Sequence, residues 1–399
     1  MNLIEMRTND AIQARVCGWI SDNYQGICEY AARTCYHKEA DAKEGSWKRY
    51  LHARVKSGHE SVIEHNSVAI MFQVDPMMKN ILMQLAAYVS KNNNLLHTVF
   101  NYEGNSVIIC GNLRSFRDFI KNATDALEWD RHAYTLADIW YYYIYAAFVF
   151  LTNDDFIEEE DGSKTNIFTE NLKMKSRQFT WTMIDADGTE PTALHTEDIP
   201  VVHEDNGMTL AIIGNDTVAD LRDLLVSKWG FEKGERNEFE NQCLNNAIMN
   251  IGRISYRVKI PRIISQQDTR HRIGAISQQS QRYVNAANAE FYYPVPNDTQ
   301  VVYGDNYMDI EDFYSFTIRA YDNMLDQGSK KEDARFLLPG GIMTEYVMTK
   351  PFYTLPHYFY ERTSTAAQME IRSIAVALQN YVDENIVSKD CNIDFHHGR

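Results

Sequence analysis

Residues 252–272 constrain the fold more strongly than any other stretch of the chain. The segment RISYRVKI, residues 253–260, alternates apolar and polar side chains, which is the pattern of a β-strand. Pro261 follows directly; it cannot donate a backbone hydrogen bond to a sheet, and its fixed φ suits the first turn of a helix. We therefore predict a strand over 253–260 that leads without a loop into a helix over 262–272.

Several other segments have a clear periodicity. SVAIMFQV at 67–74 and MTLAII at 208–213 read as strands, whereas residues 10–60 read as mainly helical. Apolar residues at helical spacing predict a helix over 363–382, where Thr365 and Gln368 can form a capping box. The expected fold class is mixed α/β (α+β), with a largely antiparallel sheet flanked by helices.

The middle of the chain is harder to interpret. The segment DDFIEEED at 154–161 holds six acidic residues and is typical of a solvated loop or turn. We divide the chain into an N-terminal part over 1–119, a long insertion or subdomain of unknown role over 120–245, and a C-terminal part over 246–399.

Composition excludes several classes of protein. The apolar run at 140–151 is too short to span a bilayer, which takes about 20 residues, and the first residues show no signal or transit pattern. Six cysteines without a CxxC pair fit a reducing compartment, so we expect a cytoplasmic protein. A net charge of −16 disfavours general affinity for nucleic acid or for membranes.

Positive charge is nevertheless concentrated between residues 250 and 283. Seven basic side chains stand there with a single acid, Asp268. On a helix Gln267 and Arg270 share a face and Arg272 points away from them; in an extended segment Ser280 and Arg282 lie on the same side. Such groups suit a phosphate and a planar heterocycle. The alternative is an ion-paired surface with no ligand.

The order of residues within this stretch favours a ligand site. Arg270-His271-Arg272, seven residues, Ser280 and then Gln281-Arg282-Tyr283 is a pattern that resembles the signature of the flavin-dependent thymidylate synthases. Four further segments are similar to that family in the same order along the chain: AARTCYHKE at 31–39, GHESVIEH at 58–65, EDARFLLP at 332–339 and YERTSTAAQMEIR at 360–372.

The resemblance implies the fold of that family, enlarged by the insertion, and reductive methylation of deoxyuridylate (dUMP) to thymidylate. FAD is the implied cofactor, with NADPH and methylenetetrahydrofolate as co-substrates, and a homotetramer with shared active sites is the implied assembly. The residues that it implies as contacts of FAD are Ser61, Arg270, His271, Arg272, Gln278 and His357. Those implied for the nucleotide are Gln267, Arg270, Gln278, Ser280, Arg282 and Arg335. Arg362 is implied as the catalytic arginine that favours ionisation of the uracil ring.

The sequence departs from the family pattern in one place. PFYTLPHYF at 351–359 stands where many members carry Asn-x-Arg, so Tyr353 or His357 would have to contact the flavin differently. An Asn-x-Arg occurs instead at Asn112 and Arg114, in GNLRSFRDF. This segment either has a structural role, enters the flavin site or is the remnant of a partial duplication.

Other kinds of site are not expected. His59, Glu64 and His65 do not have the spacing of a zinc motif, so we predict no metal site, and no Gly-rich dinucleotide or P-loop motif occurs. No cysteine follows a proline, which disfavours the thymidylate synthases that use a cysteine nucleophile. Three alternatives stay open: a one-carbon transferase for a related pyrimidine nucleotide, a nucleotide- or flavin-binding homologue without the activity, and a single-stranded nucleic-acid binder.

Overall fold

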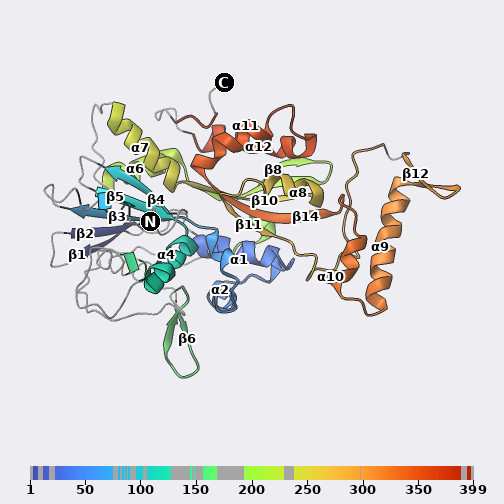
Figure 1. Ribbon diagram of the computed structural model, residues 1–399, viewed down its shortest axis with the longest axis horizontal. Coiled ribbons are helices and arrows are strands. Elements are labelled where there is room, and N and C mark those ends of the chain that lie inside the picture. The colour runs from blue at the N-terminus through green and yellow to red at the C-terminus, as the bar shows by residue number, and fades with distance from the viewer. Residues whose placement is uncertain are drawn as a thin grey trace.

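Two five-stranded sheets, each with antiparallel neighbours throughout, form the framework of the described part of the computed structural model (Figure 1). The structure describes residues 3–7, 12–17, 23–74, 96–101, 106–126, 156–168, 193–228, 238–296, 298–387 and 393–396, with single helical positions between 80 and 89 and between 144 and 148. The expected mixture of helices and antiparallel strands is confirmed. Among the described helices, none is long and apolar enough to cross a lipid bilayer.

The first sheet belongs to the N-terminal part of the chain and has the strand order β1-β2-β3-β5-β4. Its strands are β1 (Leu3–Arg7), β2 (Ile12–Cys17), β3 (Val68–Val74), β4 (His97–Asn101) and β5 (Ser106–Gly111). The helices of this part are α1 (Tyr24–Thr34), α2 (Ser46–Lys56) and α4 (Leu113–Ala126), with the short helices η1 (Glu39–Asp41) and η2 (Glu60–Glu64). The strand predicted at 67–74 is confirmed. The prediction of helix over 10–60 is wrong for β2, where Ile12, Ala14 and Val16 alternate with longer or polar residues as in a strand.

The second sheet has the order β11-β14-β10-β9-β8. Its strands are β8 (Val201–Asp205), β9 (Met208–Asn215), β10 (Arg253–Pro261), β11 (Ala275–Gln278) and β14 (Met343–Pro351). Its helices are η4 (Thr196–Asp198), α6 (Val218–Lys228), α7 (Glu238–Ile251), α8 (Arg262–Asp268), η6 (Phe352–Thr354), α11 (Leu355–Arg362) and α12 (Met369–Asn385). The strands predicted at 208–213 and 253–260 are confirmed. The domain boundaries at 119 and 245 stay predictions, although β8 and β9 pair into the sheet of β10.

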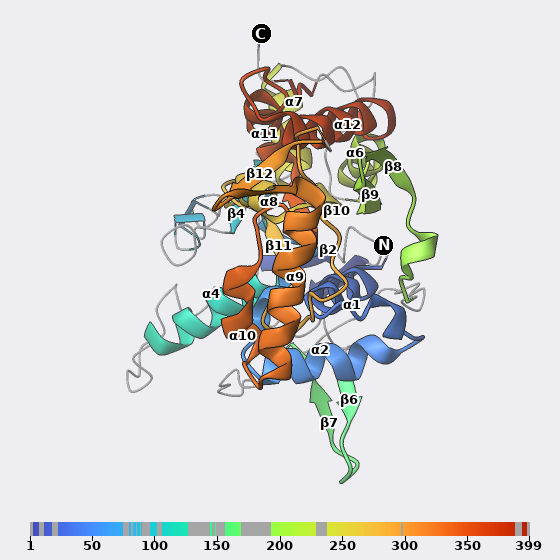
Figure 2. The ribbon, with the colours of Figure 1, turned by 90° about the vertical axis from the view of Figure 1, so that its right-hand side faces the viewer.

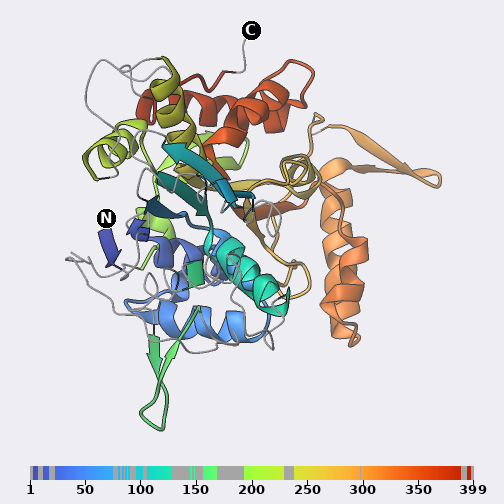
Figure 3. The same cartoon turned by 60° about the vertical axis from the view of Figure 1, so that its left-hand side comes forward.

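Two smaller elements extend outward. A hairpin of β6 (Phe156–Glu158) and β7 (Lys164–Asn166) occupies the acidic segment that was predicted to be a loop, with its turn at the acids themselves. The other is an arm made of β12 (Gln300–Tyr303), β13 (Asn306–Asp309), α9 (Ile310–Asp326), α10 (Lys331–Ala334) and η5 (Arg335–Leu337). Helix α9 of the arm stands apart from the two sheets in both Figure 1 and Figure 3.

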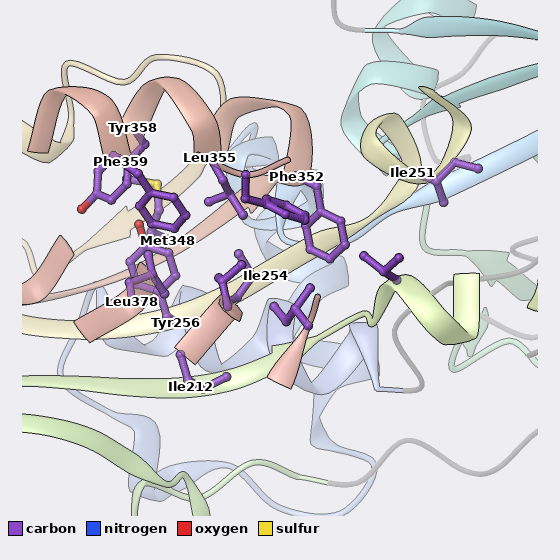
Figure 4. Packing of buried hydrophobic residues seen from close by; sticks show 14 of the residues in the cluster. Ile212, Ile251, Ile254, Tyr256, Met348, Phe352, Leu355, Tyr358, Phe359 and Leu378 are labelled. Atoms are coloured by element: carbon purple, nitrogen blue, oxygen red, sulfur yellow. The ribbon is translucent and has the colours of Figure 1, made fainter. Parts of the chain in front are cut away.

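Strand β10 lies in the middle of the second sheet and is buried on both faces, so its predicted polar face is not solvated. One face carries Ile254, Tyr256 and Val258, which pack against α11 and α12 in the main core (Figure 4). The opposite face of the sheet is covered by α1, because Tyr30 and Ala31 pack with Ala211 and Val347 of the neighbouring strands. Figure 2 shows α11 and α12 at one end of the molecule and α1 and α2 at the other. The second sheet is therefore a middle layer between two sets of helices.

The helix after Pro261 is shorter than predicted, because it ends at Asp268 and does not reach Arg272. The chain must turn at once to begin β11, which pairs with β14. Gly274 makes this turn with φ of +151°, and a Cβ there would lie 3.0 Å from the carbonyl oxygen of Thr349. Arg270 therefore lies beyond the helix, and the predicted shared helical face of Gln267 and Arg270 does not form.

Helix α12 confirms the predicted apolar spacing but not the predicted cap. Ile371, Ile374, Ala375, Leu378 and Val382 are all buried in the main core. The helix begins at Met369, and the side chain of its N-cap, Gln368, makes no capping hydrogen bond. Gln368 Oε1 instead accepts a hydrogen bond of 2.8 Å from Gln267 Nε2, so its side chain is used to tie α12 to α8.

Candidate active site

A cavity of about 220 Å³ lies where the two sheets meet, and we call it the junction cavity. Residues of both sheets line it, among them Asn112 and Arg114 from the end of β5 and the start of α4. From the second sheet come Arg272, beside β11, and Tyr353, in η6. Three guanidinium groups, those of Arg114, Arg253 and Arg272, therefore border one space, which suits an anion.

Asn112 and Arg114 are held in place by their own element. Asn112 Oδ1 accepts hydrogen bonds from the backbone N–H of Ser115 (2.8 Å) and from its hydroxyl (2.9 Å), so Asn112 caps α4. Its Nδ2 group keeps no partner among the described residues. The Arg114 guanidinium is bonded to Glu64 and lies 3.5 Å from Asp118. Burial raises the pKa of Glu64, and the charge of Arg114 opposes that rise.

His97 and Tyr353 join the two sheets at the wall of the cavity. Tyr353 Oη and His97 Nε2 are 2.8 Å apart, and the two rings meet edge to face with centroids 4.8 Å apart. Burial lowers the pKa of His97, and the nearby charge of Arg253 lowers it further, so the ring is neutral at pH 7. Arg253 itself donates three hydrogen bonds to the carbonyls of residues 250–252, which commits it to the backbone before β10.

A second group of side chains surrounds the C-terminal end of α8. Arg362, at the last residue of α11, donates from Nε to His271 Nε2 (2.9 Å) and from Nη2 to the carbonyl oxygen of Gln267 (3.0 Å). Burial lowers the pKa of His271 to about 4, and the charge of Lys350 acts in the same direction. A neutral imidazole is what this geometry requires, because His271 Nε2 must accept the bond. The third nitrogen of Arg362, Nη1, has no partner among the described residues.

A buried ion pair lies beneath this group. Lys350 Nζ is 3.4 Å from Asp268 Oδ1, and both side chains are fully buried. Tyr346 Oη donates to Asp268 Oδ2 at 2.7 Å, and the ammonium of Lys350 lies 4.4 Å from the ring centroid of Tyr358. The ring of Tyr358 in turn packs edge to face on His271. The pair therefore fixes the end of α8 and the surroundings of His271.

A third group lies near the N-terminal end of α8. Arg282 Nη2 is 3.1 Å from Glu332 Oε2, while Arg335 Nε donates to the Glu332 carbonyl at 3.2 Å. Arg262 donates to the carbonyl of Gln279 at 3.3 Å. Burial lowers the pKa of Arg262, and the charge of Arg335 adds to this, so the two cations are close to each other. We call Arg262, Arg282, Arg335 and Glu332 the arginine cluster.

Ser280 and Gln278 hold the intervening loop. The backbone N–H of Ser280 donates to the carbonyl of Cys35 (2.9 Å), so the loop is tied to the end of α1. Gln278 Nε2 donates to Ser265 Oγ at 2.7 Å and is thus committed to α8. Beside the loop lies a second cavity of about 320 Å³, lined by Gln279, Gln281 and the ion pair of Lys259 with Glu290.

The structure gathers some of the predicted site residues and separates others. Gln267, His271 and Arg362 are in direct contact, and Arg282 and Arg335 meet at Glu332. Of the residues predicted to contact FAD, Arg272 alone lines the junction cavity. The others do not line it: Ser61 is exposed on η2, Arg270 is exposed beyond α8, and the His357 ring is 5.8 Å from that of His271.

Sequence reasoning missed several residues that shape these groups. Glu332 was visible in the sequence as the acid three residues before Arg335, and Asp268 as the only acid of the basic stretch. Lys350 and His97 carry no sequence signal that we can identify, because their partners are brought to them by sheet pairing. Among the described residues, no three or more His, Cys, Asp or Glu side chains are arranged to hold a metal ion.

Comparison with known proteins gives a consistent result. The family model described as thymidylate synthase complementing protein matches residues 233–386. A flavin-dependent thymidylate synthase of Pyrococcus furiosus is 29% identical over 166 residues, which cover 38% of this chain and 68% of the relative. Enzymes of the same name from Geobacter sulfurreducens and Aquifex aeolicus are 37% identical over 123 residues and 29% identical over 141 residues. The matches cover 31% and 32% of this chain and only 53% and 44% of those two relatives.

Proposed function

We propose, from the match of residues 233–386 to the family model and from the similarity to flavin-dependent thymidylate synthases, that the chain methylates dUMP to thymidylate with FAD, NADPH and methylenetetrahydrofolate. The observation that carries the proposal is the distribution of guanidinium groups around α8. The arginine cluster lies at one end of this seven-residue helix, and Arg362 with neutral His271 lies at the other. The groups at the two ends of this short helix can thus bind the phosphate and the ring of one nucleotide.

The arginine cluster would bind the phosphate of the nucleotide. Arg282 is the more exposed member, with 54% of its side chain accessible, and Glu332 keeps its guanidinium oriented. A phosphate carries more charge than a carboxylate and accepts a bidentate bond from arginine. Binding would therefore replace the contact of Arg282 with Glu332 by a contact with phosphate, while Arg335 approaches from the side of the Glu332 backbone.

Arg362 would act on the uracil ring. Negative charge develops on this ring when electron density is moved to its carbon 5, and a fixed guanidinium stabilises that charge. Two of the three nitrogens of Arg362 are already bonded to His271 and Gln267, so the group is oriented before the ligand arrives. Nη1 is then available for a ring oxygen. No protein nucleophile is needed, and we assign none.

FAD would lie across the junction cavity. The donors there fit its phosphates, since Arg272, Arg114 and the Nδ2 group of Asn112 border one space. At about 220 Å³ the cavity is smaller than the roughly 300–1,000 Å³ that enclose a drug-sized ligand, so it would take the phosphate part and not the whole cofactor. When bound, FAD supplies the hydride chemistry of the reaction. Arg272 and His271 are adjacent in the chain, which would bring the flavin and nucleotide sites side by side.

The arm supports the further proposal that the chain associates with itself. Phe336, next to Arg335, is 85% exposed, and Val302, Tyr303, Tyr307 and Phe316 of the same arm are also more than half exposed. Apolar side chains of this size are usually covered in a stable assembly. A second copy seated on the arm would close the open side of the arginine cluster, consistent with a homotetramer that shares its sites.

Release of tritium from dUMP labelled at carbon 5 tests the activity. With FAD, NADPH and methylenetetrahydrofolate present, we expect tritium in water at a rate that requires all three, and none when any one is withheld. A protein that binds FAD and dUMP but releases no tritium would instead be a binding homologue. One observation favours that second candidate: Pro351–Tyr353, where many family members have Asn-x-Arg, offers no guanidinium or side-chain amide to a flavin.

A further inference from the structure

The chain contains the same arrangement of elements twice. We infer that residues 3–126, the first unit, and residues 201–385, the second unit, are two copies of one structural unit, and that the first copy is a permanent in-chain partner which completes a single flavin site. The second half of this inference rests on the proposed function. The duplication itself rests on topology alone.

The two sheets match strand by strand. The first has the order β1-β2-β3-β5-β4 and the second β8-β9-β10-β14-β11, and every pair in both is antiparallel. Hairpins alone would explain neighbours that are consecutive in sequence. They do not explain why β5 is inserted between β3 and β4, nor why β14 is inserted in the same way between β10 and β11.

The helices follow the same sequence of steps. In each unit a hairpin is followed by two helices, α1 and α2 or α6 and α7, and then by the central strand β3 or β10. Helical positions come next, at 80, 83–84, 86–87 and 89 in the first unit and in α8 of the second. After the last strand, each chain segment enters a helix, α4 or α11. In addition, the second unit has the arm and helix α12.

Each unit places one helix on the outer strands of the other unit's sheet. Helix α1 of the first unit packs on β11 and β14 of the second, and α7 of the second packs on β4 and β5 of the first. The segment just before β3 crosses over as well: His65 lies 3.0 Å from both Thr349 Oγ1 and Ser277 Oγ. Ser67 Oγ donates to the carbonyl of Ile251, the residue that ends α7 before β10, at 2.7 Å. The two units therefore pack directly against each other within one chain.

The lining of the junction cavity identifies the equivalent residues. It includes Asn112 and Arg114 directly after β5, and Pro351 and Tyr353 at the end of β14, where many members of the family carry Asn-x-Arg. We therefore take Asn112–Arg114 and Pro351–Tyr353 as equivalent segments. Asn112, Arg114 and Tyr353 all line the junction cavity, so this cavity lies where the two copies of one segment face each other.

The two units provide different side chains to the flavin site. The first unit provides the amide and guanidinium of Asn112 and Arg114, whereas the second unit has Pro351 and Tyr353 at the equivalent positions. The second unit provides Arg272 in the turn that leads to β11. In the first unit the equivalent connection between β3 and β4, residues 75–96, contains no arginine. One complete set of flavin contacts therefore exists in each chain, assembled from both copies.

Titration of the full-length protein with FAD, followed by absorbance or calorimetry, tests this division. We expect one FAD per chain. Asn112→Ser keeps an oxygen for the α4 cap but removes the amide donor, and Arg114→Gln removes the guanidinium; each should raise the Kd for FAD at least tenfold. Lys121→Gln, on the exposed side of the same helix, is the matched control and should bind as the unmodified protein does. Thermal unfolding shows whether each variant keeps its fold.

The outcomes separate this inference from the proposed function. Two FAD per chain would overturn the single shared site. Unchanged FAD affinity in both Asn112→Ser and Arg114→Gln would overturn the role of the first unit while leaving a flavoenzyme in place. A protein that binds no FAD at all would contradict the proposed function, and the assignment of the junction cavity would fail with it.

Discussion

At the scale of single residues, the environment of Arg362 decides what this side chain can do. Its guanidinium donates two hydrogen bonds, one to the neutral imidazole of His271 and one to the backbone carbonyl of Gln267. Neither acceptor is charged, so neither neutralises the positive charge of Arg362. Arg282 and Arg114, in contrast, are ion-paired with carboxylates. Arg362 thus remains a full, fixed positive charge, which is the property that stabilisation of a developing anion requires.

Arg362→Lys should separate turnover from binding. Lysine keeps the charge but cannot donate to His271 and Gln267 and to a ligand from one rigid plane. We expect kcat to fall by about 10²-fold or more, with KM for dUMP changed by less than about threefold. Steady-state kinetics measures both, and unfolding curves control for stability. A raised KM at constant kcat would show that Arg362 only binds the nucleotide.

His65 makes the stability of the protein depend on pH. Burial lowers its pKa to about 3 from an ordinary value of 6.5, so the folded state excludes a proton that the unfolded chain binds. Stability is complete above pH 6.5 and is lost as the pH falls toward 3; at pH 5 the loss is about 2 kcal/mol for this one group. Glutamine can bond Ser277 and Thr349 without titrating.

Between pH 7 and pH 5, the melting temperature of the unmodified protein should therefore fall by a few degrees more than that of the His65→Gln variant. Calorimetry at the two pH values gives the comparison. An equal fall in both proteins would mean that His65 does not titrate in this range, and that other groups account for the acid sensitivity.

At the scale of elements, α8 is positioned by charge that the sequence pattern did not reveal. Its last residue, Asp268, is paired with Lys350 of β14 in a fully buried contact, and burial acts to lower the pKa of that lysine. A buried pair adds little net stability, but removal of one member leaves an uncompensated charge. The pair thereby specifies where α8 ends, and with it the placement of His271.

Lys350→Met should cost about 3–5 kcal/mol of unfolding free energy, because Asp268 is left buried and unpaired. The double variant Lys350→Met with Asp268→Asn should recover most of this loss, since the amide can still accept the hydrogen bond of Tyr346. Denaturant unfolding of the two single variants and the double variant forms a complete cycle. A double variant as unstable as Lys350→Met alone would show that the loss comes from packing and not from charge.

The elements with a regular pattern are the ones that could be predicted from the sequence. Alternation over 253–260 and helical spacing from Ile371 to Val382 report local burial, and both elements form as expected. The end of α8 could not be predicted, because it depends on the pairing of β11 with β14. The same holds for Asn112 and Arg114: their motif was legible, but the cavity that they enter is created by the packing of two distant sheets.

At the scale of the whole molecule, an acidic chain gathers several arginines around one short helix and one cavity. The chain as a whole has a net charge of −16, which favours selection of a small anion over a nucleic acid. Three features converge there: the arginine cluster, Arg362 with His271, and the junction cavity between the two units. We propose that the first two bind a pyrimidine nucleotide through both its phosphate and its ring.

Equilibrium binding of dUMP compared with deoxyuridine, which lacks the phosphate, tests this claim most directly. For the unmodified protein we expect dUMP to bind at least about 100-fold more tightly, since a charge-assisted phosphate contact is lost in the nucleoside. Arg282→Ala should abolish most of that preference, with dUMP affinity falling toward that of deoxyuridine. Equal affinity for the two ligands in the unmodified protein, or a preference that survives loss of Arg282, would contradict the account.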